Sequence, residues 1–83
     1  MDYTVYVLQS LKDKKYYIGQ TNDFNYRIQC HNEGLVKSTK HRKPFILIHK
    51  EIYKTRSEAM KREQYLKSLK GGNGWKSLLY QWK

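Results

Sequence analysis

The sequence has few residues that could form a disulfide or hold a structural zinc ion. Cys30 is the only cysteine, and the three histidines are scattered along the chain. A lone cysteine cannot form an internal disulfide, and none of these residues has the close, paired spacing of zinc ligands. We therefore expect a protein of the reduced cytoplasm, with neither a disulfide framework nor a zinc centre.

Long apolar segments and chain breakers are also scarce. The longest apolar run, residues 45–48, is much shorter than the roughly 20 residues that cross a bilayer. The N-terminus lacks the charged and apolar regions of a signal peptide. Pro44 is the only proline, and no repeat or shift in composition indicates a linker. The 83 residues are thus expected to form a single domain, residues 1–83, with a small core and no membrane span.

Acidic residues are few compared with basic ones. Seven Asp and Glu stand against seventeen Lys and Arg, which gives a formal net charge of +10. This balance favours a polyanion as partner, because neutralising phosphates releases counterions. The alternatives are a basic surface that serves solubility and contact with an anionic membrane, although no basic amphipathic helix with a strongly apolar face is evident. The eight tyrosines and two tryptophans interleaved with lysines favour nucleic acid, since aromatic rings stack on bases.

The first informative pattern is a predicted hairpin. Residues 3–9 and 16–19 are rich in tyrosine, valine and isoleucine, which is typical of strands, and the connection between them is polar. If that connection holds an even number of residues, Tyr6 and Tyr17 project from the same face, because side chains alternate along a strand. The two tyrosines are then either ordinary packing residues or a pair of phenolic hydroxyls at a site.

The hairpin leads into a predicted amphipathic helix, whose start either Thr21 or Asp23 can cap and whose end Gly34 should follow. At about 100° per residue, Arg27 and His31 fall on the same stripe as Phe24 and Ile28, the stripe that should meet the sheet. Arginine is almost never fully buried unless it is paired. Arg27 therefore either extends its guanidinium to water, as isolated arginines commonly do, or lines a cleft where an anion binds.

A basic loop follows over residues 35–43. Its density of positive charge predicts contact with a phosphate backbone. The alternative is a loop whose charges are only solvated. The residues assigned to this nucleic-acid contact are Lys37, Lys40, His41, Arg42 and Lys43.

The rest of the chain predicts one strand and two helices. Residues 45–48 are expected to form a strand buried on both faces that continues less regularly to residue 53. A capping box at residues 55–58 opens a helix that should run to about residue 70, where two glycines stop it. Residues 75–83 have the apolar spacing of a short packing helix, to which we assign no chemistry.

Glu63 is singled out by elimination among the seven acidic residues. It alone is expected on rigid structure and directed inward, and such a carboxylate must find a cation; Lys67, one turn on, is the ordinary candidate. The chain does not supply the convergent carboxylates of a two-metal nuclease. One Mg²⁺ held by a single carboxylate, waters and substrate phosphate oxygens is chemically reasonable. The other six acidic residues lie at caps, ends, a turn or the irregular part of a strand: Asp2, Asp13, Asp23, Glu33, Glu51 and Glu58.

Taken together, these residues resemble the GIY-YIG nuclease superfamily, over nearly the whole chain. The second half of the signature is present as Tyr17-Ile18-Gly19, and the first is Thr4-Val5-Tyr6, which keeps the tyrosine but not the glycine. The order and spacing of Arg27 and Glu63 are similar to those of the family. Within it, the chain resembles the small single-domain branch related to the excinuclease C-subunit nuclease domain.

The resemblance implies an α/β fold of the α+β type, with a three-stranded antiparallel sheet flanked by helices. It implies hydrolysis of phosphodiester bonds with one divalent ion, Mg²⁺ or Mn²⁺, bound by Glu63. Arg27 would neutralise the scissile phosphate, and Tyr6 would act as general base or polarise the attacking water. Tyr17 would position water or phosphate, and His31 would assist proton transfer or phosphate binding.

Three hypotheses follow. The first is a Mg²⁺-dependent endonuclease, with DNA favoured over RNA as substrate, that acts on branched, damaged or otherwise non-standard structures in repair or recombination. The second is a non-catalytic nucleic-acid binder on the same scaffold. The third is a small basic subunit that docks on a larger repair or ribonucleoprotein assembly. Cleavage assays on Glu63 and Arg27 variants separate the first from the second.

Overall fold

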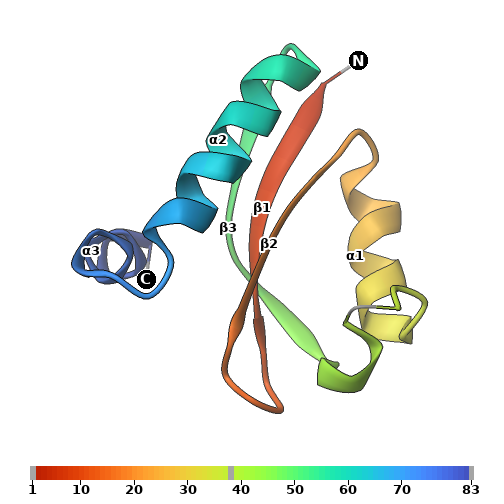
Figure 1. Ribbon diagram of the computed structural model, residues 1–83. Helices are drawn as coiled ribbons and strands as arrows, with labels where there is room; N and C mark the ends of the chain where they lie inside the picture. The colour runs from red at the N-terminus through yellow and green to blue at the C-terminus, as the bar shows by residue number, and fades with distance from the viewer. Residues whose placement is uncertain (1, 38, 83) are drawn as a thin grey trace.

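The protein is a three-stranded antiparallel sheet with helices on both sides (Figure 1). The computed structural model describes residues 2–37 and 39–82. The elements follow one another as β1 (Tyr3–Ser10), β2 (Tyr16–Thr21), α1 (Phe24–Glu33), the short 3₁₀ turn η1 (Lys40–Arg42), β3 (Phe45–Tyr53), α2 (Arg56–Leu69) and α3 (Asn73–Trp82). The strand order is β2-β1-β3. The predicted α+β class and three-stranded antiparallel sheet are thus confirmed.

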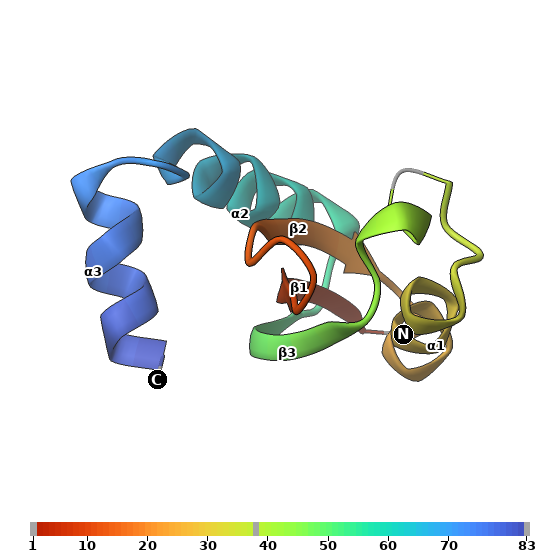
Figure 2. The ribbon, with the colours of Figure 1, turned by 90° about the horizontal axis from the view of Figure 1, so that it is seen from below.

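The hairpin register determines which side chains share a face. Tyr6 lies opposite Gly19 and Leu8 lies opposite Tyr17, so Tyr6 and Tyr17 project from the same face of the sheet. Val5, Val7 and Ile18 project from the other face. Helix α1 lies on the Tyr6 side, whereas α2 and α3 lie on the Val5 side (Figures 1 and 2).

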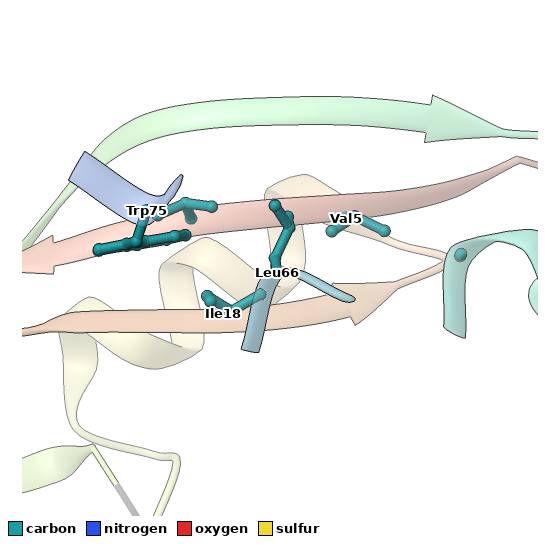
Figure 3. Packing of buried hydrophobic residues seen from close by; sticks show 6 residues of the cluster. Val5, Ile18, Leu66 and Trp75 are labelled. Carbon is teal, nitrogen blue, oxygen red and sulfur yellow. The ribbon is translucent and has the colours of Figure 1, made fainter. Parts of the chain in front are cut away.

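The larger core lies between the sheet and α2 with α3. Figure 3 shows Val5 and Ile18 of the sheet meeting Leu66 of α2 and Trp75 of α3. Leu66 is fully buried and Trp75 is only 4% exposed, so the two helices are held by well-packed apolar side chains. A smaller cluster on the opposite face joins Tyr6, Leu8 and Phe45 to Phe24 and Ile28 of α1.

The helix ends follow the predicted capping pattern. Of the two candidate caps of α1, Asp23 is the one used, because its carboxylate accepts the backbone N–H of Tyr26. Gly34 ends α1 in the left-handed conformation with φ 78°, which glycine adopts without strain. Thr55 caps α2 by accepting the N–H of Glu58, as the predicted capping box requires.

The prediction for β3 is wrong in one respect. The strand was expected to be buried on both faces over residues 45–48, but Ile46 and Leu47 are 42% and 43% exposed. The reason is its position at the edge of the sheet, beside β1 only. The register also shifts between Val7 and Leu8, which displaces the first part of β3 from the regular alternation.

Across the described ranges, none of the helices has the length and apolarity needed to cross a membrane.

Candidate active site

The site is built around the phenol of Tyr6, which crosses over β2 at Gly19. A Cβ atom placed on Gly19 would lie 2.6 Å from Tyr6 Oη, 2.8 Å from Tyr6 Cζ and 3.1 Å from Tyr17 Cε1. Distances this short are not tolerated between non-bonded atoms, so only glycine leaves room for the hydroxyl here. Gly19, in the second half of the signature, thus leaves space for Tyr6, in the first half, across the hairpin.

His31 is the residue that joins Tyr6 to the rest of the site. Its side chain is fully buried, and its Nε2 lies 3.1 Å from Tyr6 Oη. The Tyr17 ring packs against the imidazole with 4.9 Å between ring centroids. Helix α1 places His31 on its last turn, directed toward the sheet as the helical stripe predicted.

Thr39 is the hydrogen-bonding partner of His31 Nδ1. The Thr39 hydroxyl donates to the carbonyl oxygen of Val36 (3.4 Å), and His31 Nδ1 lies 2.8 Å from the same hydroxyl oxygen. With the Thr39 proton directed at Val36, the hydroxyl oxygen can accept from Nδ1–H, and this is the arrangement that we propose. Nε2 of the neutral imidazole is then the acceptor for the Tyr6 hydroxyl, which gives a directed chain from Tyr6 through His31 to Thr39.

The protonation states are consistent with that direction. Burial, and to a lesser extent the charge of Arg27, lowers the pKa of His31 to about 4, so the imidazole is neutral at pH 7. Burial raises the pKa of Tyr6 to about 12, with contributions from Tyr17 and Glu63, whereas the hydrogen bond and charge of Arg27 lower it. Arg27 thus favours the phenolate, but burial outweighs its effect on the pKa of Tyr6. Tyr6 is a neutral phenol.

Arg27 lies at the rim of the site on α1. Its side chain acts on both Tyr6 and His31 while the residue remains exposed. It also lines a cavity of about 360 Å³ between the end of β2 and the starts of α1 and α2, to which Arg56 contributes as well. Of the two alternatives that the sequence leaves open for Arg27, the structure therefore shows a guanidinium that reaches solvent and lines a cleft at once.

Glu63 lies on α2, which packs on the face of the sheet opposite α1. Its side chain is 18% exposed, and its charge raises the pKa of Tyr6. Lys67 Nζ lies 3.7 Å from its carboxylate, so the ordinary i,i+4 partner expected from the sequence is present. Lys67 itself is 55% exposed, and a pair of this kind contributes little to stability. The carboxylate thus remains accessible to a stronger cation.

The donor set fits a magnesium ion that takes one protein ligand. Within residues 2–37 and 39–82, no three His, Cys, Asp or Glu side chains stand together as a metal-binding group. Mg²⁺ keeps several waters and is commonly held by one or two carboxylates with substrate phosphates. Glu63 is the carboxylate that would hold it beside Tyr6.

The elimination that left only Glu63 was incomplete. Glu51 is also inward-facing, on regular β3 structure rather than an irregular strand end. It accepts two hydrogen bonds from Arg62 (2.8 and 3.0 Å) and contacts His49 and Tyr53 at 2.8 and 2.6 Å. Burial opposes its ionisation, but these hydrogen bonds lower its pKa to about 2. Glu51 therefore belongs to a saturated network that joins β3 to α2.

Thr39 anchors the basic loop, whereas most of the predicted contact residues of the loop are exposed. Thr39 is fully buried beneath His31, so the same residue that orients the imidazole also fixes the loop. Four of the predicted contact residues, Lys37, Lys40, His41 and Lys43, are exposed, but Arg42 is partly buried and pairs with Asp13 at 3.0 Å. Thr39 was missed by the sequence analysis, because a threonine in a polar loop carries no signal of its partner.

This combination of fold and site defines a family. The family model for the GIY-YIG catalytic domain matches residues 2–76, which include all the residues of the candidate site. The chain belongs to the GIY-YIG family. This domain implies a nuclease-type function directed at nucleic acid.

The relatives place the chain among small proteins named UPF0213. It is 46% identical over 59 residues to UPF0213 protein YazA of Bacillus subtilis (strain 168), a match over 70% of this chain and 60% of that protein. It is 42% identical over 65 residues to a UPF0213 protein of Staphylococcus aureus (strain Mu3 / ATCC 700698), covering 77% and 78% of the two chains. The solution NMR structure of UPF0213 protein BH0048 from Bacillus halodurans is similar with a TM-score of 0.51 and 34% identity, over 93% of this chain and 94% of that one.

Proposed function

We propose that this protein is a divalent-metal-dependent endonuclease that hydrolyses phosphodiester bonds in DNA, in branched, damaged or otherwise non-standard structures of the kind met in repair and recombination. One observation carries the proposal. Tyr6, buried between Gly19 and His31, is influenced at once by the Arg27 cation and the Glu63 carboxylate, which come from different helices. A charged carboxylate and a guanidinium on either side of a neutral phenol match the needs of phosphodiester cleavage.

The contacts among Tyr6, His31 and Thr39 support a proposed route for the proton. A water molecule at Tyr6 Oη attacks phosphorus and passes its proton to Oη, while the phenol proton moves to His31 Nε2. The bond from phosphorus to the leaving oxygen breaks, and that oxygen takes a proton from solvent. Tyr6 thus acts as general base without existing as a free phenolate, which its pKa of about 12 would disfavour.

Substrate binding would make His31 a better proton acceptor. The pKa of His31 is low because the residue is buried and because Arg27 is positively charged. A phosphate oxygen paired with Arg27 supplies a negative charge beside the same imidazole, which raises that pKa. The aromatic ring of Tyr17 packs on the imidazole and leaves its own hydroxyl to position water or phosphate.

The divalent ion would be held by Glu63, waters and phosphate oxygens. When bound, it supplies charge stabilisation to the phosphate and to the leaving oxygen. Glu63 would hold the ion from α2, whereas Arg27 would contact a phosphate oxygen from α1. Exposed residues of the basic loop, Lys40 and Lys43 among them, would bind the flanking backbone.

Cleavage of labelled branched and linear DNA in the presence of Mg²⁺ tests the proposal. We expect nicking by the wild-type protein, a loss of about 100-fold or more for Arg27→Ala and Glu63→Gln, and no nicking in the presence of a chelator. Glu63→Gln should keep its DNA affinity within about threefold of wild type, because the amide retains the shape and removes only the metal ligand.

Two variants serve as matched controls. Glu33→Gln makes the same chemical change at an exposed helix end, and Lys61→Ala removes a cation from the exposed part of α2; both should nick at the wild-type rate. Equal DNA binding by wild type, Arg27→Ala and Glu63→Gln with no cleavage under Mg²⁺ or Mn²⁺ would instead identify a passive nucleic-acid binder.

A further inference from the structure

A second cavity lies beside the hairpin turn, on the face of the sheet opposite α1. It has a volume of about 590 Å³ and is bounded by the hairpin turn, the end of α2 and helix α3. Its size is within the range of sites that hold a small organic molecule. None of the residues assigned to catalysis lines it; among the predicted contacts of the basic loop, only Arg42 does.

The lining of this cavity combines positive charge with an apolar wall. The wall is formed by Tyr16, Trp75 and Leu79, and the Tyr16 and Trp75 rings meet edge to face with 5.6 Å between centroids. The charged groups at the cavity are Lys14, Lys15, Arg42, Lys70, Lys76 and the single carboxylate Asp13.

The positive charge of the cavity is largely unneutralised. Asp13 is engaged by Arg42 Nε at 3.0 Å and by the backbone N–H of Lys15 at 2.9 Å. Lys70 Nζ donates to the carbonyl oxygen of Tyr16 at 2.6 Å, which fixes the ammonium at the wall. Burial, followed by the charges of Arg42, Lys67 and Lys15, lowers the pKa of Lys70. An anion in the cavity would relieve this crowding of like charges.

We propose that this cavity binds one nucleotide unit of single-stranded nucleic acid, with its phosphate on Lys15, Lys70 and Lys76 and its base against the wall of Tyr16, Trp75 and Leu79. A phosphate alone would not use the wall, and an apolar ligand would not use the lysines. A base has a free face only when it is unpaired. The inference deepens the proposed function, since it names an unpaired strand as part of the substrate.

The geometry of β2 connects the cavity to the active site. Tyr16 and Tyr17 are neighbours in one strand, so one faces α3 and the cavity while the other faces His31. Lys70, which caps the C-terminal end of α2, lies two turns beyond Glu63, about 10 Å along the helix axis. A strand that passes over the exposed edge of β2 would reach both places, as a branch or flap does at its junction with a duplex.

Binding measured without metal tests the inference separately from cleavage. Fluorescence anisotropy of a labelled single-stranded oligonucleotide is recorded in chelator for wild type, Lys76→Glu and the control Lys61→Glu, which makes the same charge change outside both cavities. We expect Lys76→Glu to weaken single-strand affinity about tenfold or more and Lys61→Glu to change it by less than about threefold, at matched salt. Equal effects of the two variants would overturn the proposal.

An NMR titration of the labelled protein separates a nucleotide from an anion. A nucleoside monophosphate should shift the amide signals of Tyr16, Lys70, Gly71 and Lys76 and bind more tightly than inorganic phosphate. Equal affinity for phosphate would mean an adventitious ion only, and shifts confined to α1 would place the ligand elsewhere; either result overturns the proposal. If the cavity binds the oligonucleotide as expected while no DNA is nicked, the inference stands and the nuclease proposal fails.

Discussion

Gly19 illustrates how closely the site depends on single atoms. Its missing side chain is the space that the Tyr6 hydroxyl occupies, and Tyr6 in turn contacts His31. A methyl group at this position would displace the phenol from the hydrogen bond that directs its proton. The structural demand at Gly19 is therefore one of space, since its backbone does not adopt the left-handed conformation seen at Gly34 and Gly71.

We expect Gly19→Ala to abolish detectable nicking, because the added Cβ would lie 2.6 Å from Tyr6 Oη. The unfolding free energy should fall by about 1–3 kcal/mol from overpacking, which denaturant unfolding measures. Gly74→Ala is the matched control, since its Cβ would meet only Leu69 side-chain atoms at 3.4 Å or more. Nicking by Gly19→Ala at the wild-type rate would contradict the assigned position of Tyr6.

The pKa of His31 predicts how stability depends on pH. Its value of about 4 in the folded protein lies below its ordinary value of 6.5, so the unfolded chain binds more protons between these pH values. Stability from this residue is therefore present above pH 6.5 and is lost as the pH falls toward 4, by on the order of 2–3 kcal/mol in total. Thermal unfolding at several pH values measures this loss, and the His31→Gln variant should lack it.

Thr39 should determine which nitrogen of His31 carries the proton. We expect ring ¹⁵N chemical shifts at pH 7 to show a protonated Nδ1 and an unprotonated Nε2 in the wild-type protein. In Thr39→Val the hydroxyl that accepts from Nδ1 is lost, so the tautomers should mix and the nicking rate should fall by about tenfold. A wild-type spectrum with Nε2 protonated would contradict the proposed direction of proton transfer.

At the scale of elements, the hydrogen bonds and ring contacts around Glu51 connect β3, α2 and α3. Glu51 on β3 binds Arg62 of α2, and its partner His49 stacks on Trp82 of α3 with 4.1 Å between ring centroids and 6° between planes. Trp75 of the same helix packs on Tyr16 and in the core. Helix α3 is thus attached at both ends through aromatic side chains.

We expect Glu51→Gln to lower the unfolding free energy by about 1–3 kcal/mol, because it leaves the partly buried Arg62 cation without a charged partner. The folded-state pKa of about 2 lies below the ordinary value of 4.5, so this contribution is present above pH 4.5 and lost as the pH falls toward 2. Denaturant unfolding at pH 7 and pH 3 should show a difference between wild type and Glu51→Gln that shrinks at the lower pH. Glu33→Gln, at an exposed position, should change stability by less than about 0.5 kcal/mol.

Local patterns made much of the fold predictable, and long-range pairing limited the rest. The alternation of a strand, a helix cap and a terminating glycine are signals that involve only a few neighbouring residues. The hairpin, the start of α2 and the end of α1 could therefore be predicted from the sequence. The exposure of Ile46 and the burial of Glu51 could not, because they depend on β3 lying at the sheet edge and on Arg62 eleven residues away. Among the residues of the candidate site, Arg27 was predicted from the helical stripe and Glu63 by elimination, each with the family resemblance, whereas Thr39 has no signal apart from the fold.

At the scale of the whole molecule, positive charge is spread over surfaces on both sides of β2. The exposed lysines of the basic loop lie beyond α1, and those of the second cavity lie beside α3. With a formal net charge of +10, the protein should bind nucleic acid with an affinity that falls steeply with salt. Arg42, which is paired with Asp13, should contribute less to that dependence than the free loop lysines.

We expect Lys40→Ala and Lys43→Ala each to reduce the slope of log affinity against log salt by about one, as the loss of one phosphate contact does. Anisotropy titrations of a labelled duplex across a range of salt concentrations provide the measurement. Lys61→Ala should leave the slope unchanged. A slope that is flat for the wild-type protein would contradict the assignment of a phosphate-binding surface to the loop.

The pairing of β1 with β2 has a consequence for how this hairpin tolerates change. Because neighbouring side chains on β2 point to opposite sides, sliding the strand by one position would bring Ile18 or Gln20 opposite Tyr6 in place of Gly19. Either side chain would occupy the space that the Tyr6 phenol needs. The same shift would also move the Tyr16 ring away from Trp75. Insertions or deletions of a single residue in the turn at 11–15 should therefore be selected against more strongly than substitutions there, and a library of turn-length variants would reveal it.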